Sequence, residues 1–295
     1  MLNLKSDMQA VAEDIERVLD SLLPPVEGPR GRVVEAMRYA CLDGGKRLRP
    51  YLTVAAADMF DAPRERSLRT GAALEMIHCY SLIHDDLPAM DDSDLRRGRP
   101  SAHKKFDEAT AILAGDGLLT YAFEVLADPA THPDAETRAR LVRDLAVAAG
   151  AAGMVGGQMI DLSSERETLD FDGVAELQRL KTGALIRYGC EAGGIVGGAT
   201  ESEIDALRGY AEDLGLAFQI VDDLLDAFGS AEELGKPAGQ DADMEKATFV
   251  KLLGADGARA KAEELVSSAC ARLDGFGNRN SALTMVARFV LDRSS

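Results

Sequence analysis

Apolar residues recur at the spacing of an α-helix along most of this 295-residue chain. The first such stretch contains Val11, Ile15, Val18, Leu19 and Leu22. Pro24-Pro25 ends it, because proline cannot continue a helix. No convincing run of alternating apolar and polar residues is present, tryptophan is absent, and aromatic residues make up only 5% of the chain. This pattern predicts an all-α fold and disfavours a β-sandwich.

Further helices are expected wherever the helical spacing returns. The expected segments are 33–41, 50–58, 67–86, 107–127, 134–160, 172–198 and 201–228, with one or two helices filling 256–292. No linker of biased composition divides them, so we expect a single domain over 1–295. The stretch 229–248 is rich in Gly, Asp and Lys, and we interpret it as a functional loop and a candidate lid.

The formal net charge of −17 indicates an acidic surface. Such a surface repels nucleic acid and anionic lipid, so neither is expected as a partner. It also repels a polyanionic substrate, unless basic residues or metal ions gather locally.

The cysteines and the N-terminal residues indicate a compartment. Cys41, Cys79, Cys190 and Cys270 form no C-x-x-C pair, which disfavours a zinc site or a disulfide framework. The first twenty residues lack the basic-then-apolar pattern of a signal peptide. No uncharged apolar run reaches the roughly 18 residues needed to span a bilayer. We therefore expect a soluble cytoplasmic protein without a membrane span.

The motif DDLLD at 222–226 places acids in an otherwise apolar helical run. Asp222 and Asp226 are four residues apart and share one helix face, with Asp223 beside them. Like charges at that spacing destabilise a bare helix, and burying them unpaired is costly. A divalent cation removes both penalties, and Mg²⁺ prefers carboxylate oxygens. The alternative is a solvated acidic stripe.

A second acidic motif, DDLPAMDD, occupies 85–92. Asp85 and Asp91 are six residues apart, which points them to different faces of an ideal helix. Pro88 distorts the preceding turn, so we expect the helix to end or bulge here and to swing Asp91 back toward Asp85. Acids at a helix C-terminus oppose the macrodipole, so a compensating cation is expected. The alternative is a helix end that trails into an acidic loop.

Two such clusters can face each other across a helical bundle. Bundles commonly build metal sites from inward carboxylates on facing helices. The pair is therefore far more specific for a metal site than either cluster alone.

Basic residues gather beside these clusters despite the net charge. They are Lys46, Arg47 and Arg49 in GGKRLRP, Arg96, Arg97 and Arg99 after the first cluster, Lys236 and Lys246 after the second, and Lys181 in KTG. Gly44-Gly45 lets the backbone approach a ligand, and Pro50 suits the first position of a helix, so GGKRLRP predicts a phosphate site at a helix N-terminus. Ordinary surface salt bridges are the alternative.

Two polar residues share helix faces with the acidic clusters. His78 lies seven residues before Asp85, and Gln219 lies three residues before Asp222. Near these clusters His78 becomes a candidate substrate contact, although a histidine that only packs is the alternative. Gln219 taken alone would be little evidence for a functional site.

Together these motifs resemble those of the trans-prenyl diphosphate synthases, and in particular of the bacterial farnesyl diphosphate synthases. The matching segments, in family order, are GGKRLRP, SLIHDDLPAMDDSDLRRGRPSAH, AILAGD, GGQMIDL, KTG, FQIVDDLLD and GK-x-x-G-x-D. They run from about residue 40 to residue 250. The two Asp motifs together with the Arg pair are highly specific for this family.

The resemblance implies a single-domain helical bundle with a central cavity, working as a homodimer with three Mg²⁺ ions. By family role, the main metal ligands are Asp85, Asp91 and Asp222, assisted by Asp86 and Asp226. The allylic diphosphate is held by Arg96, Lys181, Lys236 and Lys246. Isopentenyl diphosphate is held by Lys46, Arg49, His78 and Arg97. Thr182 and Gln219 lie near the allylic carbons and, with Lys181, form the catalytic set.

The expected chemistry is prenyl transfer. Ionising an allylic C–O bond requires the growing charge on the leaving diphosphate to be neutralised, which Mg²⁺ and lysines placed beforehand can do. The allylic cation needs a cavity that excludes water. The double bond of isopentenyl diphosphate then attacks C1 of the cation, and the released diphosphate takes the last proton.

One local departure and one product-length determinant stand out. Where the family often has Lys-Thr/Ser-Thr-Tyr/Phe-Pro, this chain reads Lys246-Ala247-Thr248-Phe249-Val250, so the local turn is expected to differ. Tyr80 lies five residues before Asp85, about 7–8 Å along the helix. Family members with an aromatic residue at this position and the longer DDLPAMD spacing tend to stop at C15, so Tyr80 is expected to form the floor of the growing-tail pocket; plain core packing is the alternative.

Four other functions remain open at this point. Geranylgeranyl diphosphate synthase differs from the C15 enzyme only at the pocket floor. A terpene cyclase typically has an Asn/Ser/Glu second motif and lacks RRG and GGKRLRP. A silent regulatory subunit usually loses one Asp motif. The hypothesis of an acidic divalent-ion buffer does not explain the basic clusters.

Overall fold

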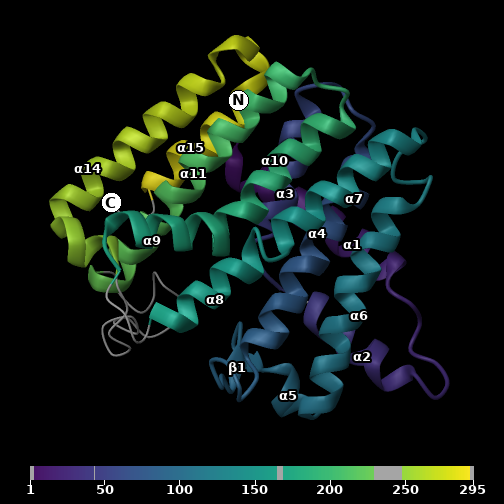
Figure 1. Ribbon diagram of the computed structural model, residues 1–295. Coiled ribbons are helices and arrows are strands. Elements are labelled where there is room, and N and C mark those ends of the chain that lie inside the picture. The colour runs from purple at the N-terminus through teal and green to yellow at the C-terminus, as the bar shows by residue number, and fades with distance from the viewer. Residues whose placement is uncertain (1–2, 43, 165–168, 229–247, 293–295) are drawn as a thin grey trace. The chain divides into compact units, whose positions relative to one another are not determined.

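The computed structural model describes residues 3–42, 44–164, 169–228 and 248–292. Helices dominate these residues, and the predicted all-α class is confirmed. The chain forms two compact units: residues 1–143 with 195–197, and residues 144–194 with 198–295. Figure 1 labels the elements of both units. The single domain expected over 1–295 stays a prediction.

The first unit is built around one buried helix, α4 (Arg64–Asp85). Helices α1 (Leu4–Leu22), α2 (Gly31–Cys41), α3 (Leu48–Asp58) and α6 (Glu108–Ala127) pack against it. Its core includes Ile15, Leu19, Tyr51, Leu74 and Ile77, all fully buried. Because four helices enclose α4, most of its residues are buried.

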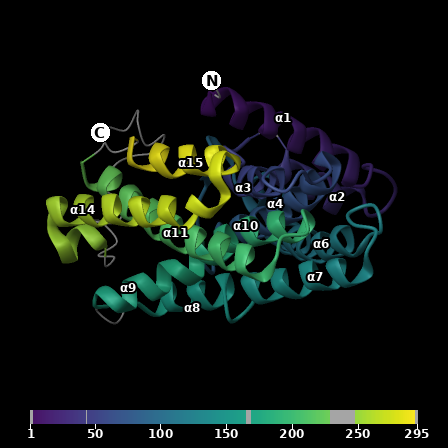
Figure 2. The ribbon, with the colours of Figure 1, turned by 90° about the horizontal axis from the view of Figure 1, so that it is seen from above.

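The second unit packs three long helices together. Helices α11 (Glu201–Phe228), α14 (Phe249–Arg272) and α15 (Ser281–Asp292) are in mutual contact and run beside one another in Figure 1 and Figure 2. Tyr210 on α11 donates its hydroxyl hydrogen bond to the Leu283 carbonyl at 2.8 Å, which ties α11 to α15. Helix α8 (Met154–Ser164), α9 (Phe171–Gln178) and most of α10 (Ala184–Val196) complete this unit.

Most expected helices begin and end near their predicted bounds, but three differ. The segment 134–160 is two helices, α7 (Ala135–Ala149) and α8, separated by a turn over 150–153. Gly153 N–H bonds to the Gly150 carbonyl at 3.0 Å, and a Cβ on Gly153 would lie 2.0 Å from the Ala148 carbonyl oxygen, so only glycine permits this turn. The second difference is in α3, which begins at Leu48, so that Pro50 is its third residue and not its first.

The third difference lies in 172–198, which contains a π-helical turn, η1 (Arg179–Gly183), between α9 and α10. A π turn adds one residue to the helical register, and such turns are frequent at functional sites. It carries Lys181 and Thr182, to which the family resemblance gives a catalytic role.

A two-stranded hairpin was not predicted. Strands β1 (Leu95–Arg96) and β2 (Arg99–Pro100) pair antiparallel, and Arg97 and Gly98 form the turn with φ of +53° and +75°. Positive φ at both central residues is typical of the tightest hairpin turns. A short helix α5 (Ala102–Lys105) follows, and α6 begins at the Asp107 cap, which accepts the Thr110 N–H. The strands are too short for an alternating pattern to reveal them.

The C-terminal part contains two more local irregularities. Helix α14 begins at Phe249, before the expected start at 256, and Gly254, with φ of +70°, kinks it. A 3₁₀ stretch, η2 (Asp274–Asn280), separates α14 from α15.

Two helical segments are long and apolar enough to cross a membrane by length and composition: Glu108–Ala127, and 135–164, which spans α7, its turn and α8. They are weak candidates, because the core helix of a soluble protein passes the same test. Helix α6 packs against α2 and α4.

Candidate functional site

The first acidic cluster begins where α4 ends. Asp85 is the last residue of α4, and the chain then folds back so that the Asp91 N–H bonds to the Asp85 carbonyl at 2.9 Å. The Asp92 N–H bonds to the Leu87 carbonyl at 3.1 Å, which closes the loop around Pro88. The predicted return of Asp91 toward Asp85 is therefore confirmed for the backbone. Asp85 is half-buried, and Asp91 is exposed.

Asp86 binds an arginine within this cluster. Its carboxylate accepts from Arg96 Nε at 3.0 Å and from Arg96 Nη2 at 2.5 Å. Burial raises the pKa of Asp86, and the hydrogen bond and charge of Arg96 act against that rise. This ion pair attaches the hairpin to the end of α4, so Asp86 already has a strong cationic partner in the protein.

Adjacent hairpin residues reach different partners. Arg96 contacts Asp86, whereas Arg97 Nη1 donates to the Gly44 carbonyl at 2.8 Å. The side chain of Arg97 thus reaches back from the hairpin to the loop before α3. The turn conformation of Arg97 and Gly98 makes this division between two neighbouring arginines possible.

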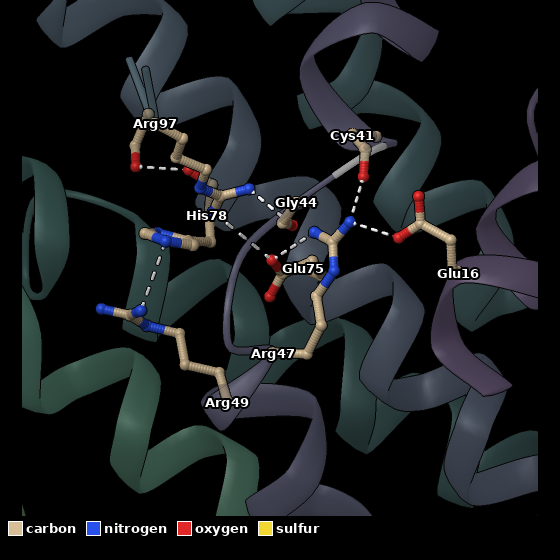
Figure 3. Close-up of polar contacts among 9 residues, drawn as sticks. Glu16, Cys41, Gly44, Arg47, Arg49, Glu75, His78 and Arg97 are labelled. Carbon is tan, nitrogen blue, oxygen red and sulfur yellow. Dashed lines mark hydrogen bonds and ion pairs between the residues drawn. The ribbon is translucent and has the colours of Figure 1, made fainter. Parts of the chain in front are cut away.

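Three of the four residues assigned to isopentenyl diphosphate lie together, as Figure 3 shows. Arg49 Nη1 lies 3.4 Å from His78 Nε2. Loss of hydration lowers the pKa of His78 well below its usual value, and the charges of Arg49, Arg97, Arg47 and Arg96 lower it further. The neutral ring can therefore accept a hydrogen bond from Arg49. Lys46, the fourth residue, is exposed in the adjoining loop.

Arg47 differs from the other basic residues of GGKRLRP. Its guanidinium is buried and donates to Glu75 at 2.7 Å and to Glu16 at 2.6 Å. Arg47 therefore does not offer the free cation that its place in the cluster suggested. Sequence reasoning also missed Glu75, although a lone acid in the apolar run ALEMIH signals a buried partner.

The site makes a pH-dependent prediction for His78. Its folded-state pKa lies below the usual value of 6.5, so as pH falls below about 6.5 the unfolded chain takes up a proton that the folded chain does not. Folding free energy is therefore lost in that window, by at most about 1.4 kcal/mol per pH unit. Thermal unfolding of wild type and His78→Gln between pH 7 and pH 5 checks this, and the variant should lose less stability. Parallel curves would contradict it.

The second acidic cluster lies on α11, in the other unit. Asp222 is half-buried, and Asp226 is buried. Asp223 has a structural contact: its Oδ2 accepts the Phe249 N–H at 2.7 Å, at the start of α14. Gln219 is half-buried on the same helix. The facing of the two acidic clusters stays a prediction.

The π turn η1 holds Lys181 against α8. Lys181 Nζ donates to Asp161 Oδ2 at 2.5 Å, which joins the KTG and GGQMIDL motifs. Thr182 follows it and is half-buried. A Cβ on Gly157 of α8 would lie 2.2 Å from the Lys181 backbone nitrogen, so glycine permits this close approach.

Gly157→Ala should therefore displace η1. We expect a loss of about 1–3 kcal/mol in folding free energy from overpacking. We also expect a fall in kcat of up to about 10²-fold as Lys181 and Thr182 move. Gly275→Ala is the control, because a Cβ there meets nothing within 4 Å. Thermal unfolding and steady-state kinetics check both, and equal behaviour of the two variants would contradict the prediction.

The donor chemistry fits magnesium. Asp85, Asp91 and Asp222 offer only carboxylate oxygens, which Mg²⁺ prefers. Within the described parts of the chain, no group of three or more His, Cys, Asp or Glu side chains could hold a metal ion. Mg²⁺ does not need such a cage, because it is usually bound by one or two carboxylates with water and substrate phosphates. Lys236 and Lys246 and the candidate lid, apart from Thr248, lie outside the described residues.

An all-α fold with two aspartate-rich helix ends and a cluster of arginines around a neutral histidine defines a helical enzyme of the isoprenoid synthase type. The chain belongs to the polyprenyl synthetase family, whose model matches residues 31–275.

Similar proteins cover the whole chain. A farnesyl diphosphate synthase of Haemophilus influenzae is 42% identical over 297 residues, covering 100% of both chains. A solved FPP/GFPP synthase structure from Zymomonas mobilis matches with a TM-score of 0.89 and 48% identity, covering 98% of this chain and 99% of the other. A heterodimeric geranylgeranyl pyrophosphate synthase large subunit of Arabidopsis thaliana is 44% identical, covering 96% of this chain and 78% of its own length.

Proposed function

We propose that this prenyltransferase condenses dimethylallyl and geranyl diphosphate with isopentenyl diphosphate to give trans-farnesyl diphosphate. The observation that carries the proposal is the arginine cluster around His78 in a chain of net charge −17. Such a concentration of cations in an acidic protein fits a diphosphate ligand. Relatives named as farnesyl diphosphate synthases support the choice of product.

Isopentenyl diphosphate is held by Lys46, Arg49, His78 and Arg97 in this proposal. The arginines provide planar, bidentate contacts to phosphate oxygens, and Lys46 adds a mobile charge from the exposed loop. Neutral His78 can donate one hydrogen bond to the phosphate while its other nitrogen accepts from Arg49.

The allylic diphosphate is held by Arg96 and Lys181, with Lys236 and Lys246. The carboxylates of Asp85, Asp91 and Asp222 hold Mg²⁺, with Asp86 and Asp226 assisting. When bound, the metal ions neutralise charge on the departing diphosphate. We propose three such ions.

The protein's own residues guide the carbon chemistry. The oxygens of Thr182 and Gln219 can face the positive charge that develops on the allylic carbons. Apolar side chains exclude water from the cation. The double bond of isopentenyl diphosphate forms the new bond at C1, and the released diphosphate accepts the proton that is lost.

The product-length assay tests the proposal most directly. The protein is incubated with isopentenyl diphosphate, Mg²⁺ and dimethylallyl, geranyl or farnesyl diphosphate in turn, and the products are separated by chromatography. We expect C15 product from the first two starters, little extension of the third, and no product when a chelator removes the metal. A C20 product from farnesyl diphosphate would favour a geranylgeranyl diphosphate synthase, the alternative that the Arabidopsis relative supports.

Related measurements address the other classes. A terpene cyclase would release hydrocarbon or alcohol from farnesyl diphosphate alone. A silent subunit would give no product with any starter. A divalent-ion buffer would bind Mg²⁺ equally with and without a bisphosphonate in calorimetry, whereas the proposed enzyme couples the two.

We also propose a cytoplasmic homodimer in which both units act as one domain. The homodimer follows from the resemblance to the family, and Ile112 and Leu113 on α6, which are 43% and 57% exposed, are candidate contact residues. The molar mass measured by light scattering should be twice that of the 31.5 kDa chain. A monomeric mass would contradict the dimer but not the activity.

A further inference from the structure

A buried acid lies next to the proposed isopentenyl diphosphate site. Glu75 on α4 is 2% exposed and precedes His78 by three residues, so both share one helix face. Its Oε1 accepts from Arg47 Nη1 at 2.7 Å and lies 4.0 Å from Arg97 Nη2 (Figure 3). The Glu75 carboxylate thus lies between the buried Arg47 and Arg97, which the proposed function assigns to the substrate.

Arg47 is fixed from several directions. Besides Glu75, its guanidinium donates to Glu16 on α1 and to the Cys41 carbonyl at the end of α2. The residue is the N-cap of α3 and has a left-handed φ of +48°. Non-glycine residues adopt this conformation only where the surroundings enforce it. Arg47 therefore holds Glu75 in one place relative to α1, α2 and α3.

Arg97 is held between that carboxylate and the glycine loop. Its Nη1 donates to the Gly44 carbonyl at 2.8 Å. A Cβ on Gly45, whose φ is +95°, would lie 2.7 Å from the Arg97 guanidinium carbon. The long arginine side chain thus has one contact from the loop and one charge partner from α4, which restricts its rotamers.

We propose that Glu75 is a positioning residue: held by Arg47, its carboxylate fixes the Arg97 guanidinium for the diphosphate of isopentenyl diphosphate. The inference rests on the proposed function. The positioning role and the charge of Glu75 predict opposite effects on diphosphate binding. A negative charge beside an anion site repels the anion, so by Coulomb's law its removal would tighten binding. If Glu75 positions Arg97, its removal weakens binding instead.

Glu75→Gln separates these two effects, because it keeps the shape and removes the charge. The matched control is Glu16→Gln, which removes the other carboxylate charge that pairs with Arg47 but makes no change next to Arg97. We expect Glu75→Gln to raise KM for isopentenyl diphosphate by at least about tenfold, since a displacement of about 1 Å can cost up to 10²-fold. The kcat and the KM for geranyl diphosphate should change little, and Glu16→Gln should leave all three near wild type.

Calorimetry with inorganic pyrophosphate provides a readout that does not depend on turnover. Glu75→Gln should weaken pyrophosphate binding, and in an Arg97→Ala background the same change should have no further effect. If Glu75→Gln does not fold, Glu75→Asp replaces it, because it keeps the charge and retracts the carboxylate by one methylene. Positioning predicts weaker binding for that variant too.

Three results would overturn the inference: tighter binding in Glu75→Gln, an equal effect of Glu16→Gln, or an additive effect in the Arg97→Ala background. Wild-type product formation is measured first. If wild type makes no prenyl diphosphate, the proposed function fails. If wild type is active and the Glu75 variants bind normally, only the positioning role fails.

Discussion

Asp222→Asn should lower kcat by about 10²–10³-fold while leaving thermal unfolding unchanged. The substitution keeps the size of the side chain and removes one negative charge from the second acidic cluster. Losing a single preorganised electrostatic contact to a reacting group typically has this effect. Because Asp222 is half-buried on α11, the amide can be hydrated without unfolding the helix. Steady-state kinetics at saturating Mg²⁺ and a thermal melt measure both quantities.

Asp223→Asn is the matched control on the next residue. Asp223 is buried, and its carboxylate accepts the Phe249 N–H at 2.7 Å. An amide oxygen can still accept this bond, but without charge assistance, so we expect a loss of about 1 kcal/mol in stability. Activity should largely remain. The opposite pattern, an inactive Asp223→Asn and an active Asp222→Asn, would show that the metal-facing residue of this motif is misassigned.

Tyr80→Ala should lengthen the product beyond C15. Tyr80 is 6% exposed on α4, about 7–8 Å along the helix from Asp85, and its ring packs edge-on against His84 at 5.8 Å between centroids. Removing the ring opens space where the growing tail would end. Chromatography should then show C20 and longer products. The cavity should also cost about 3 kcal/mol of stability, which thermal unfolding measures.

Tyr80→Phe separates ring volume from the hydroxyl. It keeps the aromatic floor, so its product should stay at C15. If the Tyr80→Ala protein folds and still gives only C15, then Tyr80 is plain core packing and another residue sets the length.

Local sequence signals predicted much of the fold. The helical spacing of apolar residues located α1, α4, α6 and α11 to within a few residues, because each signal is repeated over several turns. Pro88 predicted the return of Asp91 to Asp85, because the loss of one backbone donor acts on its own neighbourhood. The β1–β2 hairpin and the α7–α8 turn were missed, because two-residue strands and short glycine turns carry too little pattern.

The sequence predicted which types of residue form the candidate site, but not which partners each of them binds. GGKRLRP contains three basic residues, and nothing within the motif distinguishes the buried Arg47 from Arg49. Glu75, which makes that distinction, lies 28 residues away along the chain. Likewise Arg96 and Arg97 are neighbours, but one binds Asp86 and the other reaches Gly44.

The sequence by itself therefore determined the class of fold, the acidic and basic motifs and the family chemistry that they resemble. Only the tertiary structure decided which cations are bound to the protein's own carboxylates and which surround His78. The physical reason is that helix periodicity is a local property. Ion pairing depends on distances between helices, and the burial of one guanidinium is set by α1, α2 and α4 together.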